Sequence, residues 1–372
     1  MTAAVPAERL DSLDVFRGVT VAAMILVSTP GTWEAVYVPL DHAAWNGWTP
    51  TDLVFPFFLF AMGMAVPFAL ARRRLAARGV RVHLIRRALV LFGLGLLLNA
   101  IKAPPPLAWS TFRIPGVLQR IALVYVAVAL LTEYTSPRTQ IVAAVIALAG
   151  YWAALTLVPV PGVGAGVLTP DGSLASYVDR RLLPGHLAFG VWDPEGLLST
   201  VPSIATALAG VFAGAWLLRS PGPDSSLTLW AAGAAAAIAG LAWGRFFPIN
   251  KNLWTSSFAL FTAGMAAQFL AVCHWLVDVR RRRGWVVPFV ALGRNALAAY
   301  VLSIGLDSLL TRWTIDSGGP SLKWMLYHAS FATWLQGCCR PESASLAYAI
   351  AYVALWAVVL TVMYRRHIFI SV

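Results

Sequence analysis

The stretch LDHAAWNGWTPTDLVFPFFLF, residues 40–60, joins two long apolar segments at residues 15–27 and 53–70. Between these segments lies a short cluster of polar and aromatic side chains: Asp41, His42, Trp45, Asn46, Trp48, Thr49, Thr51 and Asp52. The pattern predicts a chain that leaves a membrane and re-enters it within a few residues. Polar groups beside two membrane helices are energetically costly and are therefore candidates for a functional role. Any chemistry that the protein performs is expected in this cluster.

The composition excludes a soluble globule. The chain has 372 residues, of which 59% are hydrophobic and only 12% are charged, whereas soluble domains carry about 25% charged residues. Apolar runs near 20 residues in length predict transmembrane helices, because about 20 helical residues cross a ~30 Å hydrocarbon core. The strands of a membrane barrel would alternate apolar and polar residues, and these runs do not. We therefore expect an all-α, polytopic transmembrane helix bundle that forms a single integral membrane domain over residues 1–372.

Ten spans are expected, with eleven as the alternative. They cover residues 13–30, 51–70, 83–101, 116–134, 139–158, 199–218, 227–244, 253–276, 285–311 and 345–364. With both termini in the cytoplasm, sixteen basic residues fall on the cytoplasmic side and ten on the outer side, as the positive-inside rule requires. Outer loops are then expected at residues 31–50, 159–198 and 312–344. The last of these contains a candidate interfacial helix over residues 322–335.

The net charge of +12 is explained by this loop bias, so nucleic-acid binding is not expected. The sequence has no phosphate-binding Walker loop and no dinucleotide glycine fingerprint. It also has no zinc-spaced Cys/His set and no Gly-x-Ser-x-Gly nucleophile elbow. ATP hydrolysis, dehydrogenation and serine hydrolysis therefore lack support, and no metal is expected.

His42 is the first candidate catalytic residue. An imidazole has an unperturbed pKa of about 6.5, so it can accept and return a proton near neutral pH. Asp41 or Asp52 could hold the ring in one tautomer, and residues 49–52 (TPTD) are typical of a helix start. An isolated histidine at a membrane boundary usually bonds only solvent or backbone. The dense polar cluster favours the functional interpretation here.

Other candidate residues lie toward both sides of the membrane. Arg17 and the pair Arg294–Asn295 lie toward the cytoplasm, where guanidinium groups could grip phosphates of a ligand. Arginines that snorkel to the interface are the equally acceptable alternative. On the outer side, residues 250–254 place Asn250, Lys251 and Asn252 beside Trp254, a composition suited to a sugar. Glu195 adds a carboxylate before the sixth span.

Several motifs are similar to those of one known family. They are SLDVFRG from Ser12, HAAWNG from His42, TDLVFPFF from Thr51, RIPGVLQRIAL from Arg113, DPEGLLST from Asp193, NKNLWTSSF from Asn250 and GRNALAAY from Gly293. Together they cover nearly the whole chain in the expected order. The chain resembles the heparan-α-glucosaminide N-acetyltransferase family of multi-pass membrane proteins, in its short bacterial form without an N-terminal luminal extension.

The resemblance implies transfer of an acetyl group from cytoplasmic acetyl-CoA to the amine of a glucosamine-type sugar or glycan outside the membrane. His42 matches the active-site histidine of the family, as a general base or as a transient acetyl carrier. Many relatives carry Asn in an LVNxPG-like stretch where this chain has Ser28, which we group with Arg17, Arg294 and Asn295 as donor-binding candidates.

Further roles are expected on the outer side from the residue types themselves. Donors to the thioester oxygen are sought among Asn46, Asn250, Asn252 and Trp254, and Trp45 and Glu195 join the acceptor-binding candidates with Lys251. The resemblance also implies a bacterial inner-membrane location with lipid contacts, and a homodimer.

Two other functions fit the same spans. A transporter for a sugar or acyl-sugar would also need ten helices with buried polar residues, and it gains slight support from Gly93, Gly95 and Pro56. A membrane scaffold without catalysis fits less well, because a scaffold has no need for ionisable groups beside its membrane helices.

Overall fold

The computed structural model describes residues 10–75, 80–103, 107–220, 222–315, 319–335 and 339–370. The expected cytoplasmic N-terminal residues up to Arg9 and the loop residue Arg78 lie outside these ranges. Within the described residues the structure is helical, apart from two isolated β-bridges. The helices are α1 Asp11–Ser28, α2 Val54–Leu75, α3 Val80–Lys102, α4 Val117–Tyr134, α5 Pro137–Leu157, α6 Leu174–Leu182, α7 Thr200–Arg219, α8 Pro223–Trp243, α9 Ser256–His274, α10 Val287–Arg294, α11 Ala296–Arg312, α12 Leu322–Tyr327, α13 Thr333–Leu335 and α14 Pro341–Arg365.

Eight of the described helices are long and apolar enough to cross a membrane, or nine if α10 and α11 form one broken span. The helix α1 is not among them, since Asp11, Asp14 and Arg17 lie within its 18 residues. An all-helical membrane protein is thus confirmed. The count of ten spans, and the side of the membrane on which each terminus lies, stay predictions.

The ninth expected span, residues 285–311, is bent in the structure. The chain bends by 84° between α10 and α11, at Asn295. The Asn295 side chain accepts a hydrogen bond from the backbone N–H of Ile370 at 2.9 Å and donates one to the carbonyl of Ile368 at 3.3 Å. An asparagine whose side chain bonds backbone groups in this way favours a break in the helix.

Close helix contacts depend on glycine. A side chain at Gly63 of α2 would collide with the backbone of Ala207 in α7, and one at Gly210 of α7 would collide with the backbone of Phe60. The helices α1 and α10 meet in the same way, with Gly18 against Phe289. Small residues let membrane helices pack backbone to backbone, so these contacts fix the bundle that supports the loops.

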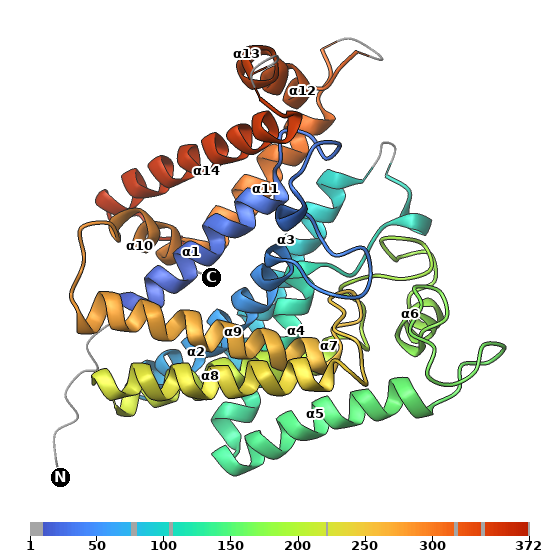
Figure 1. The fold of residues 1–372 in the computed structure, drawn as a ribbon, viewed down its shortest axis with the longest axis vertical. Coiled ribbons are helices and arrows are strands. Elements are labelled where there is room, and N and C mark those ends of the chain that lie inside the picture. The colour runs from blue at the N-terminus through green and yellow to red at the C-terminus, as the bar shows by residue number, and fades with distance from the viewer. Residues whose placement is uncertain are drawn as a thin grey trace.

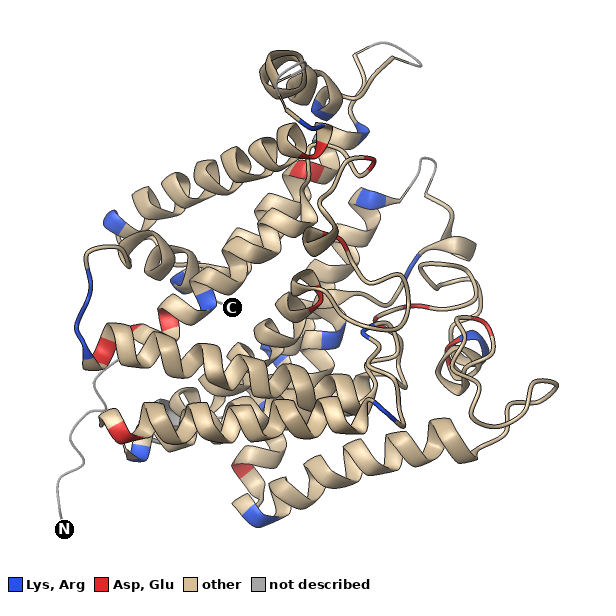
Figure 2. Ribbon diagram, in the orientation of Figure 1, with Lys and Arg blue, Asp and Glu red and all other residues tan. Residues whose placement is uncertain are grey.

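The long connections gather at one end of the bundle. Figure 1 shows the segments around α6, before α2 and after α8 on the right of the view, while the start of α1 and the end of α14 lie on the left. Charged residues lie mostly at helix ends and in loops, and the middles of the helices carry few (Figure 2). Outward faces are apolar, as on α5, where Ile141, Val145 and Ile146 are more than half exposed. This distribution suits a bundle surrounded by lipid.

The expected helix over residues 322–335 is confirmed. It consists of α12, a π-helical turn His328–Ala332 and α13 in direct succession. Trp324 and Trp334 are exposed on it and Tyr327 is buried. Exposed tryptophans on a helix at the loop end of the bundle are typical of the membrane interface.

Candidate functional site

The His42 loop is anchored at the start of α2. A 3-10 turn, Pro50–Leu53, precedes the helix, and Asp52 Oδ2 accepts hydrogen bonds from the backbone N–H of Thr49 at 3.0 Å and of Ala43 at 3.1 Å. The predicted helix start at residues 49–52 is confirmed. Because one carboxylate binds two parts of the loop, it fixes the path of the chain on both sides of the turn.

His42 is oriented by Asp52 and not by Asp41. The imidazole Nδ1 lies 2.7 Å from Asp52 Oδ1, whereas Asp41 Oδ1 accepts the backbone N–H of His42. The Asp52 side chain is 1% exposed, and that of His42 is 45% exposed. Since an ionised carboxylate only accepts, a neutral His42 ring that bonds Asp52 carries its proton on Nδ1 and has its lone pair on Nε2. The pair thus has the form of an oriented general base that is open to solvent on one side.

Lys251 completes this cluster from a distant part of the chain. Its Nζ lies 2.9 Å from Nδ1 and 3.1 Å from Nε2 of the His42 ring, and 3.5 Å from Asp52 Oδ1. Burial lowers the pKa of Lys251, while the carboxylates of Asp52 and Glu195 act in the opposite direction. The lysine therefore releases its proton more easily than an exposed lysine does.

The loop after α8 is bound to the His42 loop by amides. Asn250 Nδ2 donates to Asn46 Oδ1 at 3.1 Å, and Asn250 Oδ1 accepts the backbone N–H of Leu253 at 2.8 Å. The backbone N–H of Gly47 also donates to the carbonyl of Ile249 at 2.8 Å. Asn250 is fully buried, so it holds the two loops together. Asn252 is partly exposed in the same turn.

The indole N–H groups of two tryptophans in the expected sugar site are bound within the protein. Trp254 is fully buried, with a positive φ of 49°, and its Nε1 donates to Thr206 Oγ1 at 3.3 Å. Trp45 is partly buried, and its Nε1 donates to the carbonyl of Leu168 at 2.7 Å. Their polar atoms are thus occupied by the protein, which leaves Lys251 and Asn252 as the partly exposed polar groups of residues 250–254.

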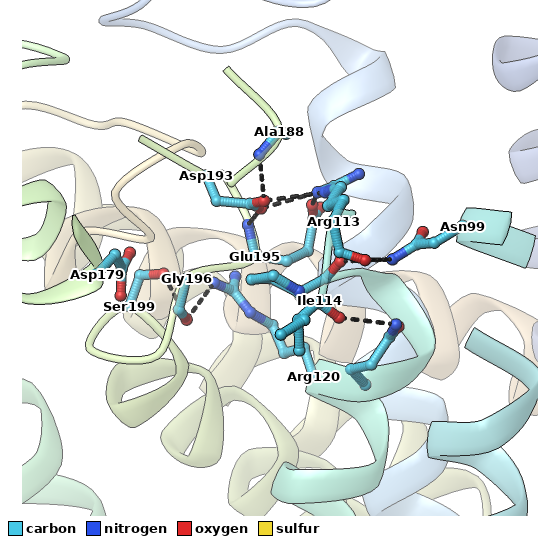
Figure 3. Close-up of polar contacts among 12 residues, drawn as sticks. Asn99, Arg113, Ile114, Arg120, Asp179, Ala188, Asp193, Glu195, Gly196 and Ser199 are labelled. Carbon is cyan, nitrogen blue, oxygen red and sulfur yellow. Dashed lines mark hydrogen bonds and ion pairs between the residues drawn. The ribbon is translucent and has the colours of Figure 1, made fainter. Parts of the chain in front are cut away.

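Glu195 belongs to an ion cluster that the sequence did not reveal. Arg113 donates to both oxygens of Asp193, at 2.9 and 2.7 Å, and to Glu195 Oε2 at 2.5 Å (Figure 3). Burial lowers the pKa of Arg113, but the two carboxylates outweigh it and raise the pKa above its usual value. Asp193 and Glu195 lie two residues apart in the DPEG motif, and Arg113 opens the RIPGVLQRIAL motif. The presence of these acidic and basic residues in two separate family motifs was the one sequence signal that could have pointed to the ion cluster.

The expected donor-binding residues are divided between the two ends of the bundle. Asp14 lies between two arginines. Arg17 pairs with its Oδ1, and Arg294 Nε lies 3.7 Å from its Oδ2. Arg294 also lies over the rings of Tyr364 and Phe369. Ser28 is eleven residues further along α1 than Arg17, about 16 Å at 1.5 Å per residue. One compact donor site therefore cannot include both Ser28 and Arg17, although an extended ligand could reach both.

The fold and the oriented histidine define a class of helical membrane protein with a candidate acid–base centre at the loop end of the bundle. Comparison with known sequences is consistent with this class. The family described as "Heparan-alpha-glucosaminide N-acetyltransferase, catalytic" matches residues 9–243, and the chain belongs to this family.

Two curated relatives extend the likeness beyond the matched segment. The chain is 29% identical to heparan-alpha-glucosaminide N-acetyltransferase of Homo sapiens across 97% of its own length, and 28% identical to the Mus musculus protein across 98%. It spans 59% and 60% of the lengths of those relatives. Within the described residues no group of three or more His, Cys, Asp or Glu side chains is placed to hold a metal ion.

Proposed function

We propose that the protein is a membrane acetyltransferase that moves an acetyl group from acetyl-CoA to the amine of a glucosamine-type sugar. The contact of His42 with Asp52 carries the proposal, since it pairs a base with the group that orients it. Membership of the acetyltransferase family supplies the reaction class. The donor, the acceptor and the sides from which they enter belong to the proposal.

In the proposed reaction His42 acts as the general base. The acceptor amine gives a proton to Nε2 as its nitrogen attacks the carbonyl carbon of the thioester. Asp52 holds Nδ1–H and stabilises the imidazolium that results. Collapse of the tetrahedral intermediate breaks the C–S bond, and the departing sulfur takes the proton. The products are an N-acetyl sugar and free CoA.

Lys251 supports the placement of an amine at this base. Its Nζ, a primary amine nitrogen, lies 3.1 Å from Nε2, within the reach that proton transfer requires. An acceptor amine can therefore approach Nε2 in the position that Lys251 occupies. Displaced from Nε2, Lys251 retains Asp52 as its ion-pair partner.

The arginines near Asp14 support donor entry from the opposite end of the bundle. Arg17 and Arg294 bring two positive charges to one buried carboxylate, which leaves a net positive charge suited to phosphate groups. A pantetheine arm that runs between the helices would then bring its thioester to His42. Cytoplasmic acetyl-CoA and an outer acceptor would occupy separate ends in this arrangement.

The test uses the full chain in lipid nanodiscs with radiolabelled acetyl-CoA and glucosamine. We expect acetyl transfer by the wild type, loss of transfer in His42→Ala, and retained acetyl-CoA binding by calorimetry in both. Asp41→Asn is the matched control, because Asp41 contacts the His42 backbone and not the ring. Absence of acetyl-CoA binding in the wild type would contradict the proposal, and uptake of sugar by vesicles without acetyl-CoA would favour a transporter.

A further inference from the structure

Arg120 is a buried arginine beside the candidate site. It lies in the first turn of α4, is 1% exposed, and its Nη2 donates to the carbonyl of Gly196 at 3.2 Å and to Ser199 Oγ (Figure 3). Its Cζ lies 5.0 Å from the centroid of the Trp254 ring. The guanidinium group is thus held in one orientation by two acceptors and an aromatic face.

The rest of the guanidinium group is unsatisfied. Within the described residues neither Nε nor Nη1 of Arg120 has a hydrogen-bond acceptor, so three of its five N–H groups lack a protein partner. A buried donor left in this state costs about 1–3 kcal/mol, and more when it is charged. An arginine kept under such a penalty is a candidate for binding a ligand oxygen.

The neighbouring carboxylates are already engaged. Asp193 and Glu195 bind Arg113, and Asp179 Oδ1 accepts the backbone N–H of Leu197 at 2.8 Å. In the described part of the chain no carboxylate forms an ion pair with Arg120. Glu195, Asp193 and Asp179 are close enough to act on its charge, but the N–H groups of Nε and Nη1 stay free to donate in a buried environment, where a hydrogen bond is stronger than in water.

Two of the four groups expected to stabilise the oxyanion, Asn250 and Trp254, already donate to other residues. Asn250 Nδ2 donates to Asn46 and Trp254 Nε1 donates to Thr206. Arg120 contacts the same Trp254 that follows Lys251 by three residues, and Lys251 in turn contacts His42. Its charge is also close enough to act on Lys251. Arg120 is therefore a buried donor with free N–H groups next to the loop that carries the site.

We infer that Arg120 donates hydrogen bonds from Nε and Nη1 to the carbonyl oxygen of the acyl thioester. This inference rests on the proposed acetyl transfer. As the amine nitrogen forms its bond to the carbonyl carbon, the C=O electron pair moves to oxygen, next to the guanidinium group. When the pair returns, the C–S bond breaks, the sulfur leaves with the electrons of that bond, and the imidazolium of His42 protonates it. Fixed donors at a developing oxyanion stabilise the transition state more than the ground state.

The experiment compares Arg120→Gln and Arg120→Lys with the wild type in lipid nanodiscs. We measure kcat for acetyl transfer, the KM for glucosamine, and the Kd for CoA, which lacks the acetyl carbonyl. Removal of one oxyanion donor costs about 10²–10³ in kcat, so we expect a fall of that size in Arg120→Gln. The Kd for CoA and the KM for glucosamine should stay within about twofold. Arg120→Lys, which keeps the charge, should recover part of the lost rate.

Three results would overturn this role. Retention of kcat within about threefold would exclude the contact with the oxyanion. Parallel losses of CoA affinity and kcat would assign Arg120 a structural role, and a selective rise in the KM for glucosamine would assign it to the acceptor. If Arg120→Gln does not fold, the same measurements of kcat, the KM for glucosamine and the Kd for CoA are made on Arg120→Lys. Failure of the proposed function is distinct, because the wild type itself would then transfer no acetyl group.

Discussion

Substitution of Asp52 by asparagine tests the orientation of His42 most directly. The carboxylate accepts from His42 Nδ1 at 2.7 Å through Oδ1, and from the backbone of Ala43 and Thr49 through Oδ2. In Asp52→Asn the amide oxygen will keep the two backbone bonds, which places the NH₂ group against Nδ1. Since NH₂ only donates, Nδ1 must become an acceptor, and the ring proton moves to Nε2.

The magnitude follows from the loss of the base. General base catalysis contributes about 10²–10⁴ in rate, which is about 2.7–5.4 kcal/mol in the activation free energy. We expect kcat to fall by this factor in Asp52→Asn. The affinity for acetyl-CoA should change little, because the proposed nucleotide contacts lie at the other end of the bundle. The backbone hydrogen bonds persist, so the fold should too.

The assay is acetyl transfer at saturating donor, with thermal unfolding and acetyl-CoA calorimetry on the same nanodisc preparations. Asp41→Asn serves as the control and should retain nearly full activity, because the Asp41 carboxylate accepts the backbone N–H of His42 and does not contact the ring. If Asp52→Asn keeps at least a third of the wild-type rate while His42→Ala is inactive, the oriented-base account is refuted.

Three further outcomes follow from burial and charge. Arg113→Gln leaves the fully buried Asp193 side chain without its cation, so it should lower the free energy of unfolding by about 3–5 kcal/mol. Thermal unfolding should show this loss as a lower midpoint. The substitution Arg181→Gln at an exposed arginine is the control and should leave the midpoint nearly unchanged. Burial raises the pKa of Asp179 to about 6, above the value near 4 of an aspartate in the unfolded chain. With respect to Asp179, the protein is therefore most stable below about pH 4, and its stability falls as the pH rises from about 4 to about 6. The variant Asp179→Asn should therefore unfold at a higher temperature than the wild type at pH 7.5 and at about the same temperature at pH 4, and an equal difference at both pH values would exclude ionisation as the cause. Gly210→Val should abolish folding or lower the midpoint strongly, because the added carbons collide with the backbone of Phe60; a gel-filtration profile and midpoint like those of the wild type would contradict the close α2–α7 contact.

The sequence by itself determined the membrane class, the approximate limits of most helices and the loop proposed as the site. Low charge and apolar runs near 20 residues leave only helices as a way to satisfy the backbone in lipid. The same local logic identified the helix start at residues 49–52, because a Pro and an acid favour a first turn whatever surrounds them. The polar cluster around His42 singled out that residue, and its match to the family motif HAAWNG supported the choice.

Only the tertiary structure decided which groups meet. Asp41 and Asp52 were equal candidates in the sequence, and the 3-10 turn before α2 is what turns Asp52 toward His42. Lys251 lies 209 residues away from His42 and reaches it only because two loops join through Asn250. The bend at Asn295 likewise depends on a tail more than 70 residues later. Contacts between distant segments depend on how the helices pack, and a local pattern of residues carries no record of that packing.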